Sequence, residues 1–180
     1  MADAGLPLFH RLYGAGCDVI PAEVAAVHAI GDEHCWHGEV MIERGGGWLV
    51  RPVCWLLGFP PEAENLALTV TMTKLGDGEI WRRLFGDWKL SSRFYPGVQP
   101  QTVTERLGPI ASTSRLDCDS GGVTQVLVAL TVFSVDVPKR FWPQVDARES
   151  ADLGQYRFAV AIRFPSGAPL IAYQGTLSVK

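Results

Sequence analysis

The sequence predicts a mainly β, α+β protein in which an antiparallel meander of about eight to ten strands closes into a calycin-like barrel. Turn residues recur about every ten positions after residue 64, and such short links force neighbouring strands to run antiparallel, because a parallel crossover needs a dozen or more residues. Several segments between the turns alternate apolar and polar residues, which is typical of strands with one buried face. A meander of this kind either closes on itself or curls around a long helix. We favour closure, because it removes both edges.

Two short helices are expected before the sheet. Leu6–Tyr13 carries apolar residues at helical spacing. Pro21 stands where a first-turn proline belongs and opens a second helix at Ala22–Ile30, which Gly31 ends. His28 lies on this second helix, where packing explains a histidine better than catalysis does.

A strand and an inserted helix follow. His34–Arg44 is predicted to be a strand, and Gly45-Gly46-Gly47 breaks it. The apolar spacing of Trp48–Leu57 favours a helix that ends at Gly58. We therefore expect a single domain, 1–180, with a helical N-terminal part at about 6–58 and an antiparallel β part at about 64–180.

The later strands are separated by tight-turn chemistry. Gly76-Asp77-Gly78, Gly86-Asp87 and Ser120-Gly121-Gly122 supply the positive φ that short hairpin turns require. The predicted strands are Asn65–Leu75, Glu79–Phe85, Trp88–Tyr95, Thr102–Leu107, Ile110–Cys118, Val123–Val135, Val145–Phe164 with a break near Gly154, and Leu170–Val179.

Composition and charge exclude several classes of function. Hydrophobic residues make up 47% of the chain and charged residues 19%, as in ordinary globular proteins. The formal net charge is −3 and the basic residues form no patch, so we expect no nucleic-acid partner. The longest apolar stretch, Val126–Val135, is too short to span a membrane, and Met1–Gly5 carries an acid where a signal peptide needs basic residues. We therefore expect a cytoplasmic protein with no membrane partner.

No metal site is indicated. His34-Cys35-Trp36-His37 lies on a predicted strand, where positions three apart face opposite ways and cannot share an ion. The four cysteines lack the short spacings of zinc or redox sites and are expected to be reduced thiols: Cys17, Cys35, Cys54 and Cys118.

The most informative feature is a set of polar side chains on faces that should point inward. Period-2 alternation places Arg83 on the face of Trp81, Ser92 on that of Leu90, and Glu105 on that of Val103, while Tyr173 shares a face with Ile171. A buried, unpaired charge costs on the order of several kcal/mol, so these groups should satisfy one another or line a cavity. A buried ion pair that fixes strand register is the structural alternative. The candidate ligand-binding residues are Arg83, Glu105, Ser92, Tyr173 and Trp81, and no catalytic residue is assigned.

Short motifs run in a fixed order through nearly the whole chain. They are Leu12-Tyr13, Val27-His28, Arg44-Gly45, Gly58-Phe59-Pro60, Trp81–Gly86, Glu105–Pro109, Val137-Pro138, Phe158, Pro165–Gly167 and Tyr173–Leu177. In this order the chain resembles an uncharacterised bacterial family, a domain of unknown function found alone or following NAD(P)-binding domains of the saccharopine-dehydrogenase or epimerase type. The resemblance implies an accessory or ligand-handling domain that works beside a redox enzyme. This chain lacks the G-x-G-x-x-G motif, so we expect no cofactor.

Three functions are open at this point. The first is a binding module that takes a small apolar or amphiphilic molecule with one polar or acidic end into the barrel, an acid lying at Arg83. The second is a cofactor-independent isomerase, cyclase or lyase with Glu105 as acid/base and Arg83 or Tyr173 as oxyanion stabiliser. The third is a structural partner domain of a dehydrogenase-like protein. A filled barrel favours the third, a cavity with paired charges the first, and a cavity in which Glu105 is exposed the second.

One connection combines basic and aromatic residues. Lys139-Arg140-Phe141-Trp142-Pro143 lies between predicted strands, where such a loop acts as a lid over the barrel mouth or as a partner contact. Ordinary loop packing is the equal alternative.

Overall fold

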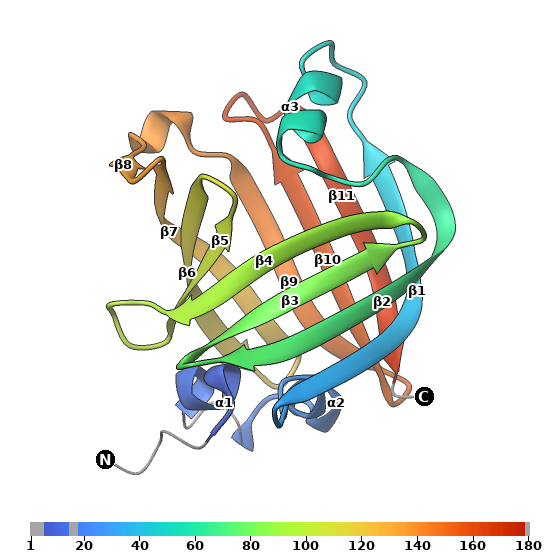
Figure 1. The fold of residues 1–180 in the computed structure, drawn as a ribbon, viewed down its shortest axis with the longest axis vertical. Coiled ribbons are helices and arrows are strands. Elements are labelled where there is room, and N and C mark those ends of the chain that lie inside the picture. Colours follow the sequence, from blue (N-terminus) through green and yellow to red (C-terminus); the bar gives the residue numbers. More distant parts are fainter. Residues whose placement is uncertain (1–5, 15–17, 179–180) are drawn as a thin grey trace.

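The computed structural model of the chain describes residues 6–14 and 18–178. Figure 1 shows antiparallel strands wrapped into a barrel, with two helices across one end and a third helix at the other. The closed antiparallel barrel predicted from the sequence is confirmed. Of the residues discussed above, Met1–Gly5, Cys17 and Val179 lie outside the described ranges.

The strands follow one another around the ring in chain order. The first strand, β1, pairs with both β2 and the last strand, β11, so the two ends of the sheet meet. The two-residue β8 only extends β7, and ten strands form the barrel. The bounds are β1 Glu33–Arg44, β2 Ala63–Leu75, β3 Gly78–Phe85, β4 Trp88–Pro96, β5 Thr102–Leu107, β6 Ile110–Asp119, β7 Gly122–Val132, β8 Val135–Asp136, β9 Gln144–Asp152, β10 Gln155–Arg163 and β11 Pro169–Ser178.

One predicted strand, Val123–Val135, is divided in the structure. β7 ends at Val132, and the next two residues, Phe133 and Ser134, turn the chain with φ values of 51° and 64°. Neither residue is a glycine, asparagine or aspartate, so no strong tight-turn signal marks this position in the sequence. β7 pairs with β9 only over Val123–Gln125, and near its end it pairs with β8 instead. The barrel wall is therefore incomplete between the upper parts of β7 and β9.

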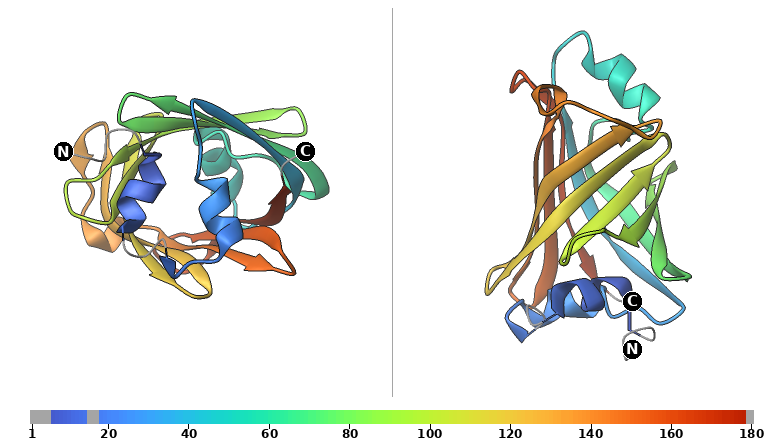
Figure 2. Two further views of the ribbon diagram at one scale, coloured as in Figure 1. Left: turned by 90° about the horizontal axis from the view of Figure 1, so that it is seen from below. Right: turned by 90° about the vertical axis from the view of Figure 1, so that its left-hand side faces the viewer.

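The two N-terminal helices close the lower end of the barrel in Figure 1. Helix α1, Leu8–Tyr13, and helix α2, Ala22–Val27, lie across the opening seen from below in Figure 2. Both are shorter than predicted at one end, and their apolar residues enter the main core together with residues of the strands. The buried Glu79 carboxylate at the start of β3 accepts bonds from the Leu8 backbone N–H at 3.0 Å and from Trp81 Nε1 at 2.9 Å. This acid joins helix α1 to the barrel wall. It also caps the N-terminus of α1, because the N-cap residue Pro7 has no side chain that can accept a hydrogen bond.

The third helix stands at the opposite end. Helix α3, Val50–Leu56, lies within the predicted Trp48–Leu57 segment, between β1 and β2. Only Val50 and Cys54 of this helix are buried, whereas Trp55 and Leu56 face outward. A short 3₁₀ turn, η2 Lys139–Phe141, lies on the connection from β8 to β9 at the same end. No helix within the described residues is long and apolar enough to cross a membrane.

Two glycines allow β1 and β11 to approach each other closely. A Cβ atom on Gly38 of β1 would lie 1.7 Å from the Thr176 carbonyl oxygen, and one on Gly175 of β11 would lie 2.1 Å from the Glu39 carbonyl oxygen. Backbone atoms cannot yield as a flexible side chain can. Glycine is therefore required on both sides of the seam that joins the first and last strands.

We predict that Gly38→Ala and Gly175→Ala each lower the free energy of unfolding by about 1–3 kcal/mol, because the added methyl group forces the paired backbones apart. Urea unfolding followed by circular dichroism measures the change. Gly46→Ala is the matched control, since nothing lies within 4 Å of its Cβ position. Equal unfolding midpoints for all three variants would contradict the close approach at the seam.

Candidate ligand-binding cavity

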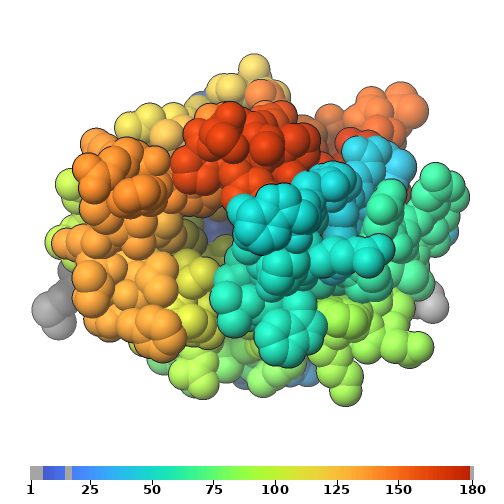
Figure 3. Space-filling model, turned by 90° about the horizontal axis from the view of Figure 1, so that it is seen from above, coloured from blue at the N-terminus to red at the C-terminus, as the bar shows by residue number. Residues whose placement is uncertain are grey.

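The interior of the barrel is hollow. A cavity of about 410 Å³ runs along the inner faces of the strands, and its wall is mostly apolar. Viewed from the end opposite α1 and α2, the surface is hollowed between α3 and the chain coloured orange to red (Figure 3). Inward residues of β10 line one side, as their alternation predicted: Tyr156, Phe158, Val160 and Ile162. The barrel thus has one closed end and one open end.

Arg83 and Glu105 meet in this cavity. The Arg83 guanidinium donates from Nη1 to Ser92 Oγ at 2.8 Å, and its Nη2 lies 3.6 Å from Glu105 Oε1. Strand register explains the meeting: Trp81 pairs with Ser92 across β3 and β4, and Phe94 pairs with Glu105 across β4 and β5. The Arg83 side chain is 15% exposed and that of Glu105 is 35% exposed. The pair is therefore only partly buried.

Aromatic rings hold the guanidinium of Arg83 in place. Its central carbon lies 5.1 Å from the centroid of the Trp81 ring and 5.7 Å from that of Phe94. Trp81 is fixed in turn by its bond to Glu79. Trp81 lines the cavity, whereas Ser92 is buried and does not, so Ser92 serves to orient Arg83.

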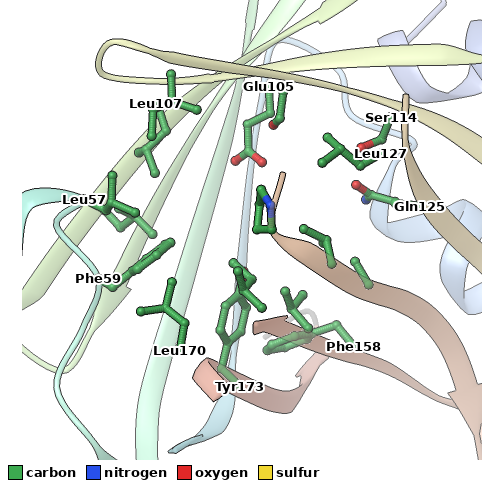
Figure 4. Close-up of a pocket in the computed structure, with 18 of the residues that line it drawn as sticks. Leu57, Phe59, Glu105, Leu107, Ser114, Gln125, Leu127, Phe158, Leu170 and Tyr173 are labelled. Atoms are coloured by element: carbon green, nitrogen blue, oxygen red, sulfur yellow. The ribbon is translucent and has the colours of Figure 1, made fainter. Parts of the chain in front are cut away.

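Tyr173 faces the charged pair from another part of the wall. Figure 4 shows the Glu105 carboxylate and the Tyr173 ring reaching into the cavity from opposite sides, with Gln125 and Ser114 on a third side. Burial raises the pKa of Tyr173 to about 12, although the nearby Arg83 charge acts to lower it. Its hydroxyl therefore stays protonated near neutral pH and can donate a hydrogen bond. The structure thus brings Arg83, Glu105, Trp81 and Tyr173 to one cavity.

A second polar cluster lies at the closed end of the cavity. His28, the residue that ends α2, is fully buried, and its Nε2 lies 2.6 Å from Glu149 Oε2 on β9. Gln125 Nε2 lies 3.5 Å from the other carboxylate oxygen, and the Tyr156 hydroxyl is also hydrogen-bonded to Glu149. The His28 ring packs against Phe9, with centroids 4.3 Å apart, and against Trp81, with centroids 5.5 Å apart, and those two rings also contact each other. The cluster therefore ties helix α2 to the barrel floor.

Environment shifts the pKa values of this cluster in opposite directions. Burial raises the pKa of Glu149, but the adjacent His28 charge and the hydrogen bonds from His28, Tyr156 and Gln125 outweigh burial, so the net pKa lies below its ordinary value. Burial, followed by the Glu149 charge and hydrogen bond, raises the pKa of Tyr156 well above its ordinary value. Near neutral pH the floor of the cavity thus carries an ionised carboxylate and a protonated phenol.

Alternation along the strands could have indicated that two members of this cluster, Glu149 and Gln125, point into the barrel. Glu149 stands two residues from Ala147 on the inward face of β9, and Gln125 stands two residues from Val123 on that of β7. His28 was interpreted as a packing residue, and its stacked position agrees with that interpretation. Its partner was missed because Glu149 lies 121 residues away in the chain.

The two histidines of β1, His34 and His37, lie on opposite faces of the strand. His34 stacks on Trp36 with ring centroids 4.9 Å apart, while His37 Nε2 lies 3.6 Å from Cys35 Sγ, as the alternation of a strand requires. Within residues 6–14 and 18–178, no three His, Cys, Asp or Glu side chains are grouped to hold a metal ion.

The Arg83–Glu105 pair is expected to contribute less stability than a fully buried pair, because Glu105 is about one-third exposed and solvent screens it. We predict a coupling energy of about 1 kcal/mol in a double-mutant cycle of Arg83→Met and Glu105→Met, measured by urea unfolding. The exposed pair Arg157 and Asp152 is the control and should show weaker coupling. Strict additivity at Arg83 and Glu105 would show that the two side chains do not interact.

Glu149→Gln should lower the free energy of unfolding by about 2–4 kcal/mol at pH 7, because it removes the charge paired with His28 in a buried site. The folded pKa of Glu149 lies below the ordinary value of 4.5. The stabilisation is therefore complete above about pH 4.5 and is lost as the pH falls through the folded value. Urea unfolding from pH 7 to pH 3 should show wild type and variant converging in acid. Asp117→Asn, at an exposed ion pair, is the control and should change little; a constant gap across the pH range would contradict the assignment.

Comparison with known proteins identifies a family without assigning an activity. Residues 20–177 match the family described as a domain of unknown function, DUF4166. No curated protein and no solved structure matches the chain. The resemblance to an uncharacterised domain family is confirmed, while bacterial origin and association with dehydrogenase-like domains stay predictions. The match extends from β1 to β11, the strands that enclose the cavity, and the chain therefore belongs to the DUF4166 family.

Proposed function

We propose that this protein binds a small apolar or amphiphilic molecule inside its barrel. The observation that carries the proposal is the apolar cavity of about 410 Å³ with a charged pair in its wall. Cavities of roughly 300–1,000 Å³ with a few convergent polar groups are typical of small-molecule sites. An unfilled interior also costs stability, since each missing apolar contact is lost. A domain that acts only as the structural partner of a dehydrogenase-like protein has no need of a cavity, and a filled barrel would be more stable. The cavity therefore favours a binding function over a purely structural one.

The polar end of the ligand is expected to lie beside Arg83 and Glu105. Arg83 already donates to Ser92 and has Glu105 as a counter-ion, so the pair presents a donor and an acceptor side by side. A hydroxyl group can use both, because it accepts from the guanidinium and donates to the carboxylate. A carboxylate, the end group expected from the sequence, gains the guanidinium but faces the Glu105 charge. We therefore favour an uncharged polar end.

A second candidate function, a cofactor-independent isomerase, cyclase or lyase, is supported by one observation. The Glu105 carboxylate lines the cavity and is one-third exposed, so it could reach a bound molecule as acid or base. Arg83 or the protonated Tyr173 would then stabilise an oxyanion. Recovery of the bound molecule after long incubation distinguishes the two when its covalent structure is compared by chromatography and NMR, since an isomer has the same mass. A binding module returns the molecule unchanged, whereas an enzyme converts it and Glu105→Gln abolishes the conversion.

The proposal is tested first by native mass spectrometry of freshly purified protein, in which a co-purified small molecule should appear. Added decanol should raise the melting temperature by mass action, since it binds only the folded barrel. If neither a bound molecule nor a thermal shift is found with apolar and amphiphilic compounds of this size, the binding function is wrong.

Two single variants test where the polar end lies. Removing the guanidinium with Arg83→Met should weaken decanoate relative to decanol by about tenfold, which corresponds to about 1.4 kcal/mol. Removing the competing charge with Glu105→Gln should shift the same ratio about tenfold toward decanoate. Calorimetric titration at pH 7 measures both ratios, and Arg93→Gln on the outer wall is the control. Equal ratios in all proteins would contradict anchoring at this pair.

A further inference from the structure

We propose that the open end of the barrel docks onto an anionic lipid bilayer, with the tryptophans of the α3 segment and the aromatics of the β7–β9 connection inserted at its surface. The function of this docking, transfer of the ligand between bilayer and cavity, rests on the proposed binding function. The docking itself does not.

Exposed aromatic residues gather at one end of the molecule. Among the described residues, the tryptophans and phenylalanines that are at least half exposed are Trp48 at 85%, Trp55 at 77%, Phe133 at 79% and Phe141 at 55%. They belong to two segments, residues 47–57 around α3 and residues 133–143 around β8 and η2, which stand on either side of the open end (Figures 1 and 3). At the closed end the exposed large apolar residues are aliphatic, with Val98 and Leu153 the most exposed.

The same two segments carry mainly positive charge. Residues 47–57 contain Arg51 and no acid, and residues 133–143 contain Lys139 and Arg140 with the single acid Asp136. All three basic residues are exposed. The two segments together carry a net charge of +2, whereas the chain as a whole has a net charge of −3. Glu62 and Asp87 on neighbouring connections contribute −2 and balance this charge over the whole end. We therefore expect the aromatics to supply most of the affinity, and the adjacent Lys139 and Arg140 to supply a local preference for anionic lipid.

The docking surface continues into the cavity. Phe141 and Pro143 line the cavity from the connection. Val53 of α3 and Leu57, which follows the helix, line it from the other side, while Trp55 and Leu56 of the helix face outward. The connection also lies where β7 and β9 are no longer paired, so here a loop stands in place of a continuous ladder. An apolar molecule could pass between these segments without leaving apolar surroundings.

A bilayer fits these observations better than a protein partner. Tryptophan, phenylalanine and leucine beside lysine and arginine are the residues of interfacial membrane contacts, where indole rings lie at the headgroup level. The two segments are separated by the mouth itself. A protein partner would have to bridge or fill that opening, whereas a bilayer can contact both rims and leave the opening facing its apolar interior.

Docking is tested with vesicles of phosphatidylcholine alone and with about one-third phosphatidylglycerol, using co-sedimentation and quenching of tryptophan fluorescence by brominated lipid. Wild type should bind the anionic vesicles more tightly and be quenched. Trp48→Ala with Trp55→Ala should reduce binding to both vesicle types by about tenfold or more. Lys139→Gln with Arg140→Gln should reduce binding to anionic vesicles by about tenfold and leave the weaker binding to neutral vesicles unchanged.

Matched controls separate docking from general surface effects. Val98→Ser with Leu153→Asn removes exposed apolar residues at the closed end, and Arg82→Gln with Arg93→Gln removes exposed charges from the outer wall of β3 and β4. Both controls should bind vesicles as wild type does. The proposal is overturned if wild type ignores both vesicle types, if the controls lose as much binding as the test variants, or if sedimentation shows that the two tryptophans instead hold copies of this chain together.

The result can be told apart from failure of the binding function. Decanol added from solution should still raise the melting temperature of the Trp48→Ala, Trp55→Ala protein, because the cavity is unchanged, while extraction of a fluorescent fatty alcohol from vesicles should slow about tenfold. Vesicle binding without any thermal shift would support docking and contradict the ligand-binding function. A thermal shift without vesicle binding would support ligand binding and contradict docking.

Discussion

A ring of ten strands encloses more space than its own side chains fill, and most of this structure follows from that constraint. An eight-stranded barrel is just wide enough for side chains to fill or for one small ligand, and two further strands widen the ring. The inner faces are already largely apolar and include large rings such as Trp81 and Phe158, yet a cavity of about 410 Å³ remains. Water in such an apolar space finds few hydrogen-bond partners, so exposing both ends of the barrel to solvent would be unfavourable. The two N-terminal helices cover one of these ends.

The two polar clusters inside the barrel answer different needs. His28 and Glu149 are almost fully buried, closely paired and supported by further hydrogen bonds, which is the arrangement that a buried charge requires. Arg83 and Glu105 lie farther apart, at 3.6 Å, and Glu105 has no hydrogen-bond partner of its own among the side-chain contacts described above. In the first cluster the protein supplies all the partners of the Glu149 carboxylate, so the cluster fits the fixing of α2 to the floor. The second keeps unused hydrogen-bonding capacity facing the cavity, so it fits contact with a ligand.

Much of the fold could be predicted because its signals are local. Turn glycines and period-2 alternation placed the strands within a few residues, and short links fixed their antiparallel order. The turn at Phe133 and Ser134 was missed because an unbroken apolar run conceals it and no glycine marks its positive φ. Helix α2 ends at Val27, short of the predicted Ile30, and the residue that caps it, His28, is the one that contacts Glu149.

The candidate site could be predicted only in part. Alternation indicated that Arg83 and Glu105 point inward, and the register across β4 then brings them together. Alternation cannot give distance around a ring, so the position of Tyr173 relative to the pair required the closed structure. The cavity itself lies beyond sequence patterning, because the same apolar faces would result from a barrel filled by side chains. The partners of His28 depend on contacts between distant parts of the chain.

The two ends of the barrel differ in how well their apolar residues are packed, and this difference favours one end as the route into the cavity. At the floor, Phe9, Trp81 and His28 pack in a buried aromatic layer that a ligand could enter only by displacing buried side chains. At the mouth, α3 buries only two of its residues, and the incomplete wall between β7 and β9 is covered by a connection rather than by paired strands. Segments with few buried contacts open at low free energy, whereas a packed floor opens only with the whole fold. Exchange of a bound molecule should therefore proceed through the mouth, past the same aromatic residues that face outward there.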